Sequence, residues 1–137
     1  MGKLSEGHSE DRCAELSEGL GNKSREKAER AARERKIVLI SEDPEIAIFL
    51  GSDGDYVIIP YTYCSCKDFS LNVVTRKKRK ACYHLYSFCL SKSRGTLLKM
   101  PIQDPVELTS LIRDTLMNAR AEGLRKLINI SESSRKV

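Results

Sequence analysis

The chain has no tryptophan, a single glutamine at Gln103 and only two histidines among its 137 residues. Its apolar residues never form the run of roughly 18–20 that would span a bilayer, and no signal-type apolar stretch opens the sequence. These absences exclude an integral membrane protein and a secreted one. We therefore expect a cytoplasmic protein, or a nuclear one if the source is eukaryotic.

Catalytic motifs are also missing. The sequence contains no glycine-rich phosphate loop, no paired-carboxylate motif and no nucleophile placed beside a base. Asp53-Gly54-Asp55 offers too few ligands for calcium or magnesium and is typical of a turn. The sequence therefore predicts a protein that is not an enzyme and that takes no small-molecule substrate.

Charge is plentiful and unevenly distributed. The 24 basic and 19 acidic residues give a net charge of +5. Residues 37–66 hold five acids and no base, whereas residues 67–94 hold eight bases and one acid. A block of +7 beside a block of −5 makes a polarised molecule whose basic part could meet a polyanion. A solvated basic loop is the alternative, and charge alone does not decide between them.

The pattern along the chain predicts a small α+β fold in four parts. Residues 1–21 are rich in Ser, Glu and Gly and predict a disordered arm, and residues 22–36 predict a charged helix capped by Asn22 or Ser24. That helix has only an alanine stripe, so we expect either a solvated spacer or an interface with a partner. Residues 37–95 form the central domain, and residues 96–137 form a C-terminal helical segment.

The central domain reads as a small antiparallel sheet followed by a helix. Residues 37–40 predict a strand, and residues 46–50 and 56–60 predict a hairpin around an Asp-Gly turn. The second hairpin strand is expected to continue through residues 61–66, with a further strand at 69–75. A helix is expected over 83–93, ended by Gly95, and a second one begins at the Asp104 N-cap. Gly123 could weaken or end this second helix, and residues 124–128 could extend it. The apolar stripe of this last helix predicts core packing or a partner-facing groove.

Five cysteines, an odd number, argue against a disulfide framework in a chain without an export signal. Cys64-Ser65-Cys66 is followed, after fifteen residues, by Cys82-Tyr83-His84. In a strand, residues i and i+2 point to one side, so both cysteines of the first pair can reach one ion. Three thiolates and one imidazole suit Zn²⁺, and four protein ligands make the site structural. The alternative is that these cysteines are simply buried in the core.

We therefore predict a zinc site made of Cys64, Cys66, Cys82 and His84. Cys89, five residues after His84, falls on the apolar stripe of its helix and is expected to pack in the core. Cys13 lies in the expected arm, where we predict a free thiol.

This arrangement resembles the SWIM zinc-finger family, whose pattern is CxC, a variable loop and then CxH in a β-β-α unit. The matching stretch covers residues 45–94, including Phe69 after the first cysteine pair. A short chain that is little more than a SWIM finger with helices looks most like the small recombination-mediator subunits of the Shu complex and their archaeal relatives. That resemblance implies a DNA-recombination and repair role beside a RecA/RadA-type recombinase paralogue.

The stretch between the two ligand pairs is strongly basic. We predict that it contacts the phosphates of DNA, single-stranded DNA included, through Arg76, Lys77, Lys78, Arg79 and Lys80, with Lys67, Lys92 and Arg94 extending the patch. The neighbouring tyrosines at 61, 63, 83 and 86 could stack on bases, although core packing is the commoner use of tyrosine. Two other functions stay open: a protein–protein adaptor without direct DNA binding, and a transposase-related DNA-binding regulator.

Overall fold

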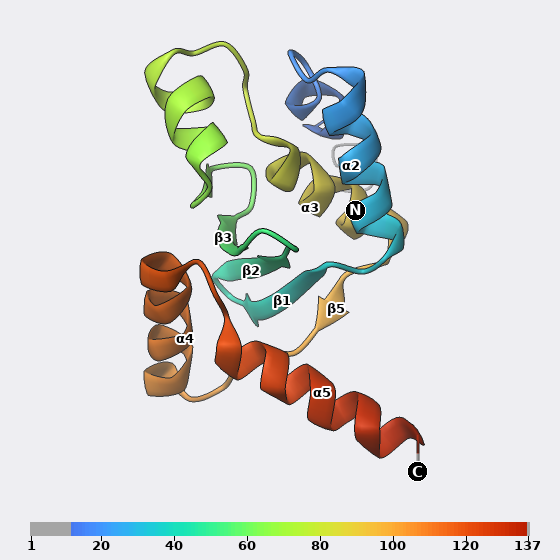
Figure 1. Ribbon diagram of the computed structural model, residues 1–137, viewed down its shortest axis with the longest axis vertical. Coiled ribbons are helices and arrows are strands. Elements are labelled where there is room, and N and C mark those ends of the chain that lie inside the picture. Colours follow the sequence, from blue (N-terminus) through green and yellow to red (C-terminus); the bar gives the residue numbers. More distant parts are fainter. Residues whose placement is uncertain (1–11, 137) are drawn as a thin grey trace.

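The computed structural model describes residues 12–136, with side chains up to residue 129. A five-stranded sheet lies in the middle, with helices α2 and α3 on one side and α4 and α5 on the other (Figure 1). The fold is α+β. Over the described residues, none of the helices combines the length and apolar character that crossing a membrane requires.

The strands run in the spatial order β4-β3-β2-β1-β5. Their bounds are β1 (Ile37–Glu42), β2 (Glu45–Leu50), β3 (Asp55–Ile59), β4 (Tyr63–Cys64) and β5 (Leu98–Lys99). The predicted hairpin is confirmed, with Phe49 opposite Tyr56 in an antiparallel pair. The expected all-antiparallel sheet is wrong, because β5 pairs parallel with β1 and makes the sheet mixed.

The stretch after Pro60 departs from the prediction. We expected residues 61–66 to continue the second hairpin strand, but the chain reverses at Tyr61 (φ 62°) and returns as β4, antiparallel to β3. The strand expected at 69–75 is instead the π-helix η1 (Phe69–Thr75). Its Val-Val-Thr run has strand propensity, but the segment forms helical hydrogen bonds and does not pair with the sheet, so tertiary context overrides the propensity.

Successive residues of the central strands enter opposite layers. Ile37 and Leu39 belong to the core on the α3 side, whereas Val38 and Ile40 belong to the core on the α4–α5 side. Because both sheet faces are covered, these strands read as continuous apolar runs instead of alternating ones. We call the α2–α3 side the first face and the α4–α5 side the second face.

Helix α2 (Asn22–Arg33) packs on α3 (Tyr83–Arg94). Its stripe of Ala28, Ala31 and Ala32 is buried, and Ala28 and Ala32 contact Leu90. The expected solvated spacer is therefore wrong, because small side chains let α2 approach α3 closely. The alanine stripe is used inside the fold and is not exposed to a partner. The expected Asn22 or Ser24 cap is also wrong: Gly21 is the N-cap and no side chain caps the helix.

The C-terminal part holds two helices where we expected one. Helix α4 (Pro105–Asn118) begins at Asp104, whose side chain accepts a hydrogen bond from the Val106 N–H as expected, and ends at Ala119 (φ 53°). Helix α5 (Glu122–Lys136) follows. The break comes at Ala119, ahead of the expected weak point at Gly123. Leu111 packs on the sheet, so the stripe of α4 is core on that side.

A buried ion pair holds this break in place. The carboxylate of Asp55, which has no exposed surface, accepts hydrogen bonds from the Ala121 backbone N–H at 2.8 Å and from the Arg125 guanidinium. Arg125 also donates to the Gly51 carbonyl oxygen. The β2–β3 turn is therefore joined to the start of α5, which the sequence did not reveal.

The N-terminal segment is more ordered than we predicted. Residues 12–16 are helical, and Cys13, Leu16 and Leu20 are buried. Cys13 forms a disulfide with Cys89 of α3, 76 residues away. The expected disordered arm is therefore wrong for residues 12–21, and so is the free thiol at Cys13; residues 1–11 lie outside the described part of the chain.

Candidate metal centre

Four predicted ligands come together on the first face. Cys64 ends β4, Cys66 follows two residues later, and Cys82 and His84 stand at the start of α3. The ligand atoms of all four residues lie within 4.8 Å of one another. Their residues are 0–5% exposed, so the cluster is closed to solvent. This buried set of three cysteines and one histidine could hold a metal ion.

Local hydrogen bonds fix the two cysteine-bearing turns. The Ser65 hydroxyl accepts from the Val57 N–H at 2.9 Å, and the Ser65 N–H donates to the Val57 carbonyl at 3.0 Å, which anchors the Cys-Ser-Cys turn to β3. The Phe69 N–H donates to Cys66 Sγ at 3.3 Å. Cys82 is the N-cap of α3, where the free N–H groups of a helix stabilise negative charge.

His84 lies among aromatic rings. The centroids of the Phe49, Tyr56 and Tyr83 rings are 4.5, 4.7 and 4.1 Å from that of the imidazole. Its Nδ1 atom is buried, and no described group hydrogen-bonds to it. An unpartnered buried polar atom costs about 1–3 kcal/mol, so a bound metal ion would supply the missing partner.

The pKa values of the three thiols also favour a bound cation. Hydrogen bonds from Cys64 and Cys82 lower the pKa of the Cys66 thiol, and the hydrogen bond with Cys66 raises the pKa of Cys64. Two hydrogen bonds act on Cys82 in opposite directions: the one with Cys64 lowers its pKa, and the one with Cys66 raises it. Burial adds to the rise, and the pKa is about 12. Without a cation, one thiolate among the three is favoured. A divalent ion would favour all three, because its charge offsets their mutual repulsion.

The basic loop, residues 67–81, joins the two halves of this cluster. Four of the predicted DNA-binding residues are exposed there without an ion pair to any described acid: Lys67, Arg76, Lys77 and Lys78. Lys77 takes a left-handed conformation (φ 52°), and the N–H groups of Lys78 and Arg79 donate to the Asn72 carbonyl oxygen. Hydrogen bonds within the loop therefore fix its backbone, and these four cationic side chains are exposed on it.

The other four predicted residues are tied to carboxylates. Arg79 donates to both oxygens of Asp68 at 2.6 and 2.8 Å, and Lys80 pairs with Glu18 at 3.0 Å. Lys92 pairs with Glu45 and Arg94 with Glu29. These last two stand in the final turn of α3, roughly 15 Å along the helix from its ligand-bearing start. Lys92 and Arg94 therefore lie at the opposite end of α3 from the point where the loop joins it, and both already pair with carboxylates.

The four tyrosines named above differ in how far their rings are covered by neighbouring side chains. Tyr83 lies against Phe49 and His84, and Tyr61 lies between Phe88 and the guanidinium of Arg12. Burial raises the pKa of Tyr83 to about 12. Tyr63 is 38% exposed and has its ring edge against Phe69. Among the four, Tyr63 is the ring most open to stacking on a base.

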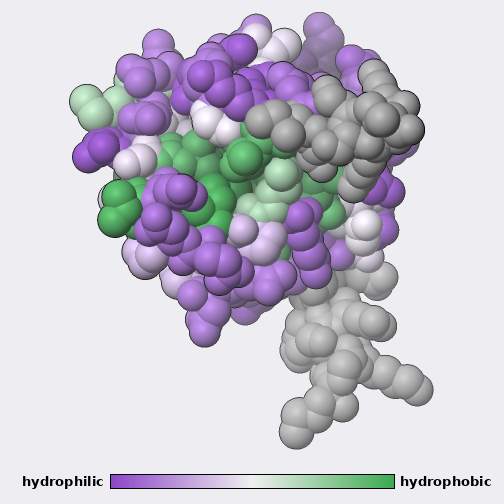
Figure 2. Space-filling view, turned by 90° about the horizontal axis from the view of Figure 1, so that it is seen from below, coloured by the Kyte–Doolittle hydropathy of each residue, from purple (hydrophilic) through white to green (hydrophobic). Residues whose placement is uncertain are grey.

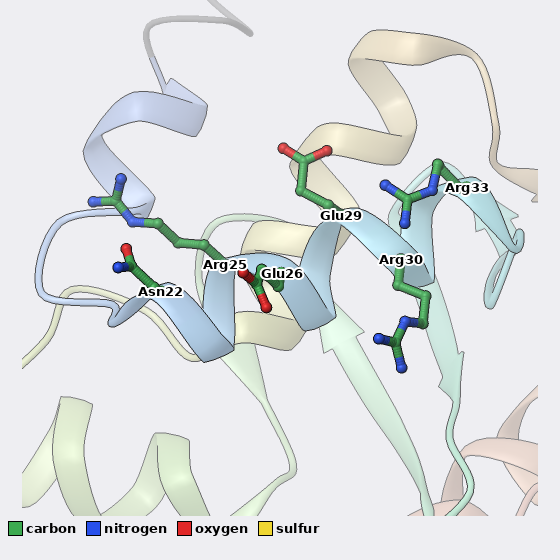
Figure 3. A pocket seen from close by; sticks show the side chains of 6 residues that line it. All are labelled: Asn22, Arg25, Glu26, Glu29, Arg30 and Arg33. Carbon is green, nitrogen blue, oxygen red and sulfur yellow. The ribbon is translucent and has the colours of Figure 1, made fainter.

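Sequence reasoning missed the acids that shape this surface. Asp68 is the lone acid of residues 67–94 and holds Arg79, a pairing that no spacing rule predicts across eleven residues. A shallow hollow on α2, shown in Figure 3, contains none of the cluster residues. Its lining mixes three arginines with two glutamates, and two of these side chains are already engaged: Glu29 with Arg94, and Arg25 with the Ser17 and Leu20 carbonyl oxygens.

Comparison with protein-family models, with curated proteins and with solved structures yields no significant match for this chain. The resemblance to SWIM fingers therefore depends on the ligand pattern and its place in the fold.

Proposed function

We propose that this chain is a SWIM-type zinc-binding protein without enzymatic activity that binds DNA as an accessory subunit in recombination and repair. One observation carries the proposal: a buried Cys3His cluster closes a basic loop at both ends. Zinc is the metal of choice because three thiolates and an imidazole suit a borderline-soft ion with tetrahedral preference. Four protein ligands leave no open position for a substrate, so the ion would be structural.

The loop is suited to phosphate because its ends are fixed. Cys66 precedes it and Cys82 follows it, so a metal bound to both would hold the loop in one shape. A loop that is already ordered loses less entropy when it binds than a free tail does. Lys67, Arg76 and Lys77 can then neutralise phosphates without regard to base sequence. The exposed ring of Tyr63 favours single-stranded DNA, whose bases are free to stack.

The recombination role and the RecA/RadA-type paralogue as partner follow from the SWIM resemblance. An apolar surface on the second face would accommodate such a partner. Seen from that side, Figure 2 shows apolar side chains gathered within a hydrophilic border. Val106 and Met117 of α4 are 73% and 77% exposed, and Leu116 is also exposed.

The same surface supports a second candidate function, a protein–protein adaptor that does not touch DNA. The observation in its favour is that half of the predicted DNA-binding residues already pair with acids of this chain. An adaptor would use the exposed apolar residues of α4, and its basic loop would face an acidic protein or solvent.

Salt dependence separates the two functions. DNA titrations would use the full chain, single- and double-stranded oligonucleotides of unrelated sequence, and several salt concentrations. Lys77→Ala with Lys78→Ala should weaken binding equally for all sequences and flatten the log–log salt slope by roughly 1.4–1.8, about 0.7–0.9 for each lost contact. Lys99→Ala with Lys126→Ala is the matched control, because it removes two exposed lysines from β5 and α5.

The result that favours the adaptor is equally clear. If the loop variant and the control bind DNA alike, with the same slope, the loop does not contact phosphate. In that case Val106→Asp with Met117→Asp should abolish capture of the protein partner while the metal content stays the same.

A further inference from the structure

We propose that the Cys13–Cys89 disulfide is a redox latch that holds residues 12–20 over the basic loop, and that a protein dithiol opens it. We call residues 12–20 the strap. Opening the latch frees the loop for phosphate. This inference rests on the proposed DNA binding, whose regulation it describes.

The strap lies directly on the basic loop. Glu18 Oε2 is 3.0 Å from Lys80 Nζ, and a shallow groove between strap and loop is lined by Glu18, Gly19, Val73 and residues 77–80. Gly19 has φ +84°, and a Cβ atom there would lie 3.2 Å from the Lys78 carbonyl oxygen. A residue without a side chain is therefore needed for the strap to come this close to the loop.

The acids of the strap compete with phosphate for the loop. Glu18 already holds the Lys80 ammonium in an ion pair, and Glu15 adds a second acid to the same strap. An anion that reaches Lys80 must displace Glu18. The covered loop consequently offers fewer free cations than the open one.

The strap is attached to the rest of the fold by side chains. Its backbone–backbone hydrogen bonds, within the described chain, stay inside the segment. The side chain of Arg25 donates to the Ser17 and Leu20 carbonyl oxygens, so the strap is fixed at the end that leads into α2. Its other end is held by Arg12, whose guanidinium lies 4.6 Å from the centre of the Tyr61 ring, and by the disulfide.

The disulfide is thus the covalent fastening of the free end. It joins Cys13 to Cys89 in α3, with Cα atoms 5.5 Å apart. After the bond is broken, the strap can pivot about its junction with α2, because its remaining attachments at that end are non-covalent. Lys80 is then released from Glu18.

The opening step is ordinary thiol–disulfide exchange. A thiolate of a dithiol reductant attacks the Cys13 sulfur, the less buried of the two, and the S–S bond breaks to release the Cys89 thiolate, which takes up a proton. The second thiol of the reductant then attacks the mixed disulfide and releases Cys13. Two electrons and two protons pass to the protein, and the reductant leaves as its own disulfide.

The test compares oxidised protein, protein reduced with dithiothreitol, and Cys13→Ser, all as full chains with the metal content measured. A single-stranded oligonucleotide is the probe, titrated at several salt concentrations. Reduction and Cys13→Ser should each raise the affinity about fivefold, the change expected if the open population rises from roughly a fifth to nearly all. The salt slope should steepen by roughly 0.7–0.9, because one lysine is freed. Hydrogen exchange over residues 12–20 should accelerate in both.

Glu18→Gln keeps the disulfide and removes the ion pair, so it should reproduce part of the gain; Glu26→Gln on α2 is its charge-matched control. Equal affinity and slope in the oxidised and reduced protein would overturn the latch but leave DNA binding standing. Unchanged exchange over residues 12–20 would overturn it as well. A metal-loaded protein that binds no DNA in either state would refute both the latch and the proposed function.

Discussion

Both faces of the sheet bury an apolar core, but within the described residues the first face adds sulfur chemistry to its packing and the second does not. On the first face, three thiols and an imidazole gather at one buried point, and a disulfide joins the N-terminal strap to α3. On the second face, Val38, Ile40 and Ile48 pack against Leu111 and Leu124.

The second face also contains the buried Asp55–Arg125 ion pair. Apolar packing depends on neither metal nor redox state, whereas sulfur ligands depend on both. We infer that the first face is conditionally stable and the second is not. Removing a stabilising element from one face should therefore leave the other face largely unaffected.

Loss of the proposed metal ion should affect the first face most. Structural zinc contributes about 10–16 kcal/mol in finger peptides, comparable with the 5–15 kcal/mol that stabilises a whole domain. Chelation or Cys64→Ser should therefore remove hydrogen-exchange protection from residues 61–94, because the cluster would lose its centre. Cys13→Ser is the control and should retain the metal. Full metal occupancy in Cys64→Ser, measured by elemental analysis, would remove Cys64 from the site.

Removing a buried side chain from the second face should have a smaller effect, which comes from lost packing alone. Leu124 is fully buried, so Leu124→Ala should lower the free energy of unfolding by about 2–5 kcal/mol. Leu127→Ala, on the same helix but 45% exposed, should cost about 0.5 kcal/mol or less. Denaturant titration measures both. The metal content should be unchanged in each, and metal loss in Leu124→Ala would show that the two faces do not respond separately.

The buried ion pair should make the second face sensitive to acid. Burial pushes the pKa of Asp55 upward, but hydrogen bonds from Arg125 and the Ala121 N–H outweigh it, so the pKa is lowered. The stabilisation is therefore fully present above the ordinary Asp value of about 3.9 and is lost as the pH falls through the lower folded-state value.

Arg125→Ala leaves the buried carboxylate without its cation. At pH 7 it should cost about 2–3 kcal/mol, less than the 3–5 expected for a fully buried pair, because 28% of the Arg125 side chain is exposed. The difference from the unaltered protein should shrink as the pH falls below about 4, where Asp55 begins to be protonated in the unfolded chain. Arg120→Ala removes an exposed ion pair with Glu122 and only the smallest of the charge effects on Asp55, so both effects should be much smaller. A loss in Arg125→Ala that is constant from pH 7 to pH 3 would contradict the role of charge.

The sequence predicted the short-range features of the molecule and missed the long-range ones. Ligand spacing is a short-range signal with few geometric solutions, so Cys64, Cys66, Cys82 and His84 could be named before their positions were known. The hairpin and the Asp104 cap are local too, and both are confirmed. Long-range pairings were missed: Cys13 with Cys89, Asp55 with Arg125, and Leu98 with Val38 in the parallel pair. Each joins residues 60 or more positions apart, where no periodicity or spacing rule applies.

The smallest predicted effect tests whether the faces are one folding unit. Asp104 caps α4 by accepting a hydrogen bond from the Val106 N–H at 3.0 Å, and such caps contribute about 0.5–2 kcal/mol. Asp104→Ala should therefore cost about 1 kcal/mol, Asp104→Ser should recover most of it, and Asp114→Ala, at an exposed site within α4, should cost less.

Native-state hydrogen exchange can follow each face separately in the metal-loaded protein. If protection falls on α4 and α5 but stays constant over residues 61–94, the faces open independently, as expected when a metal and apolar packing stabilise them separately. An equal fall on both would mean that the sheet couples them, and the metal would then stabilise the second face as well as the first.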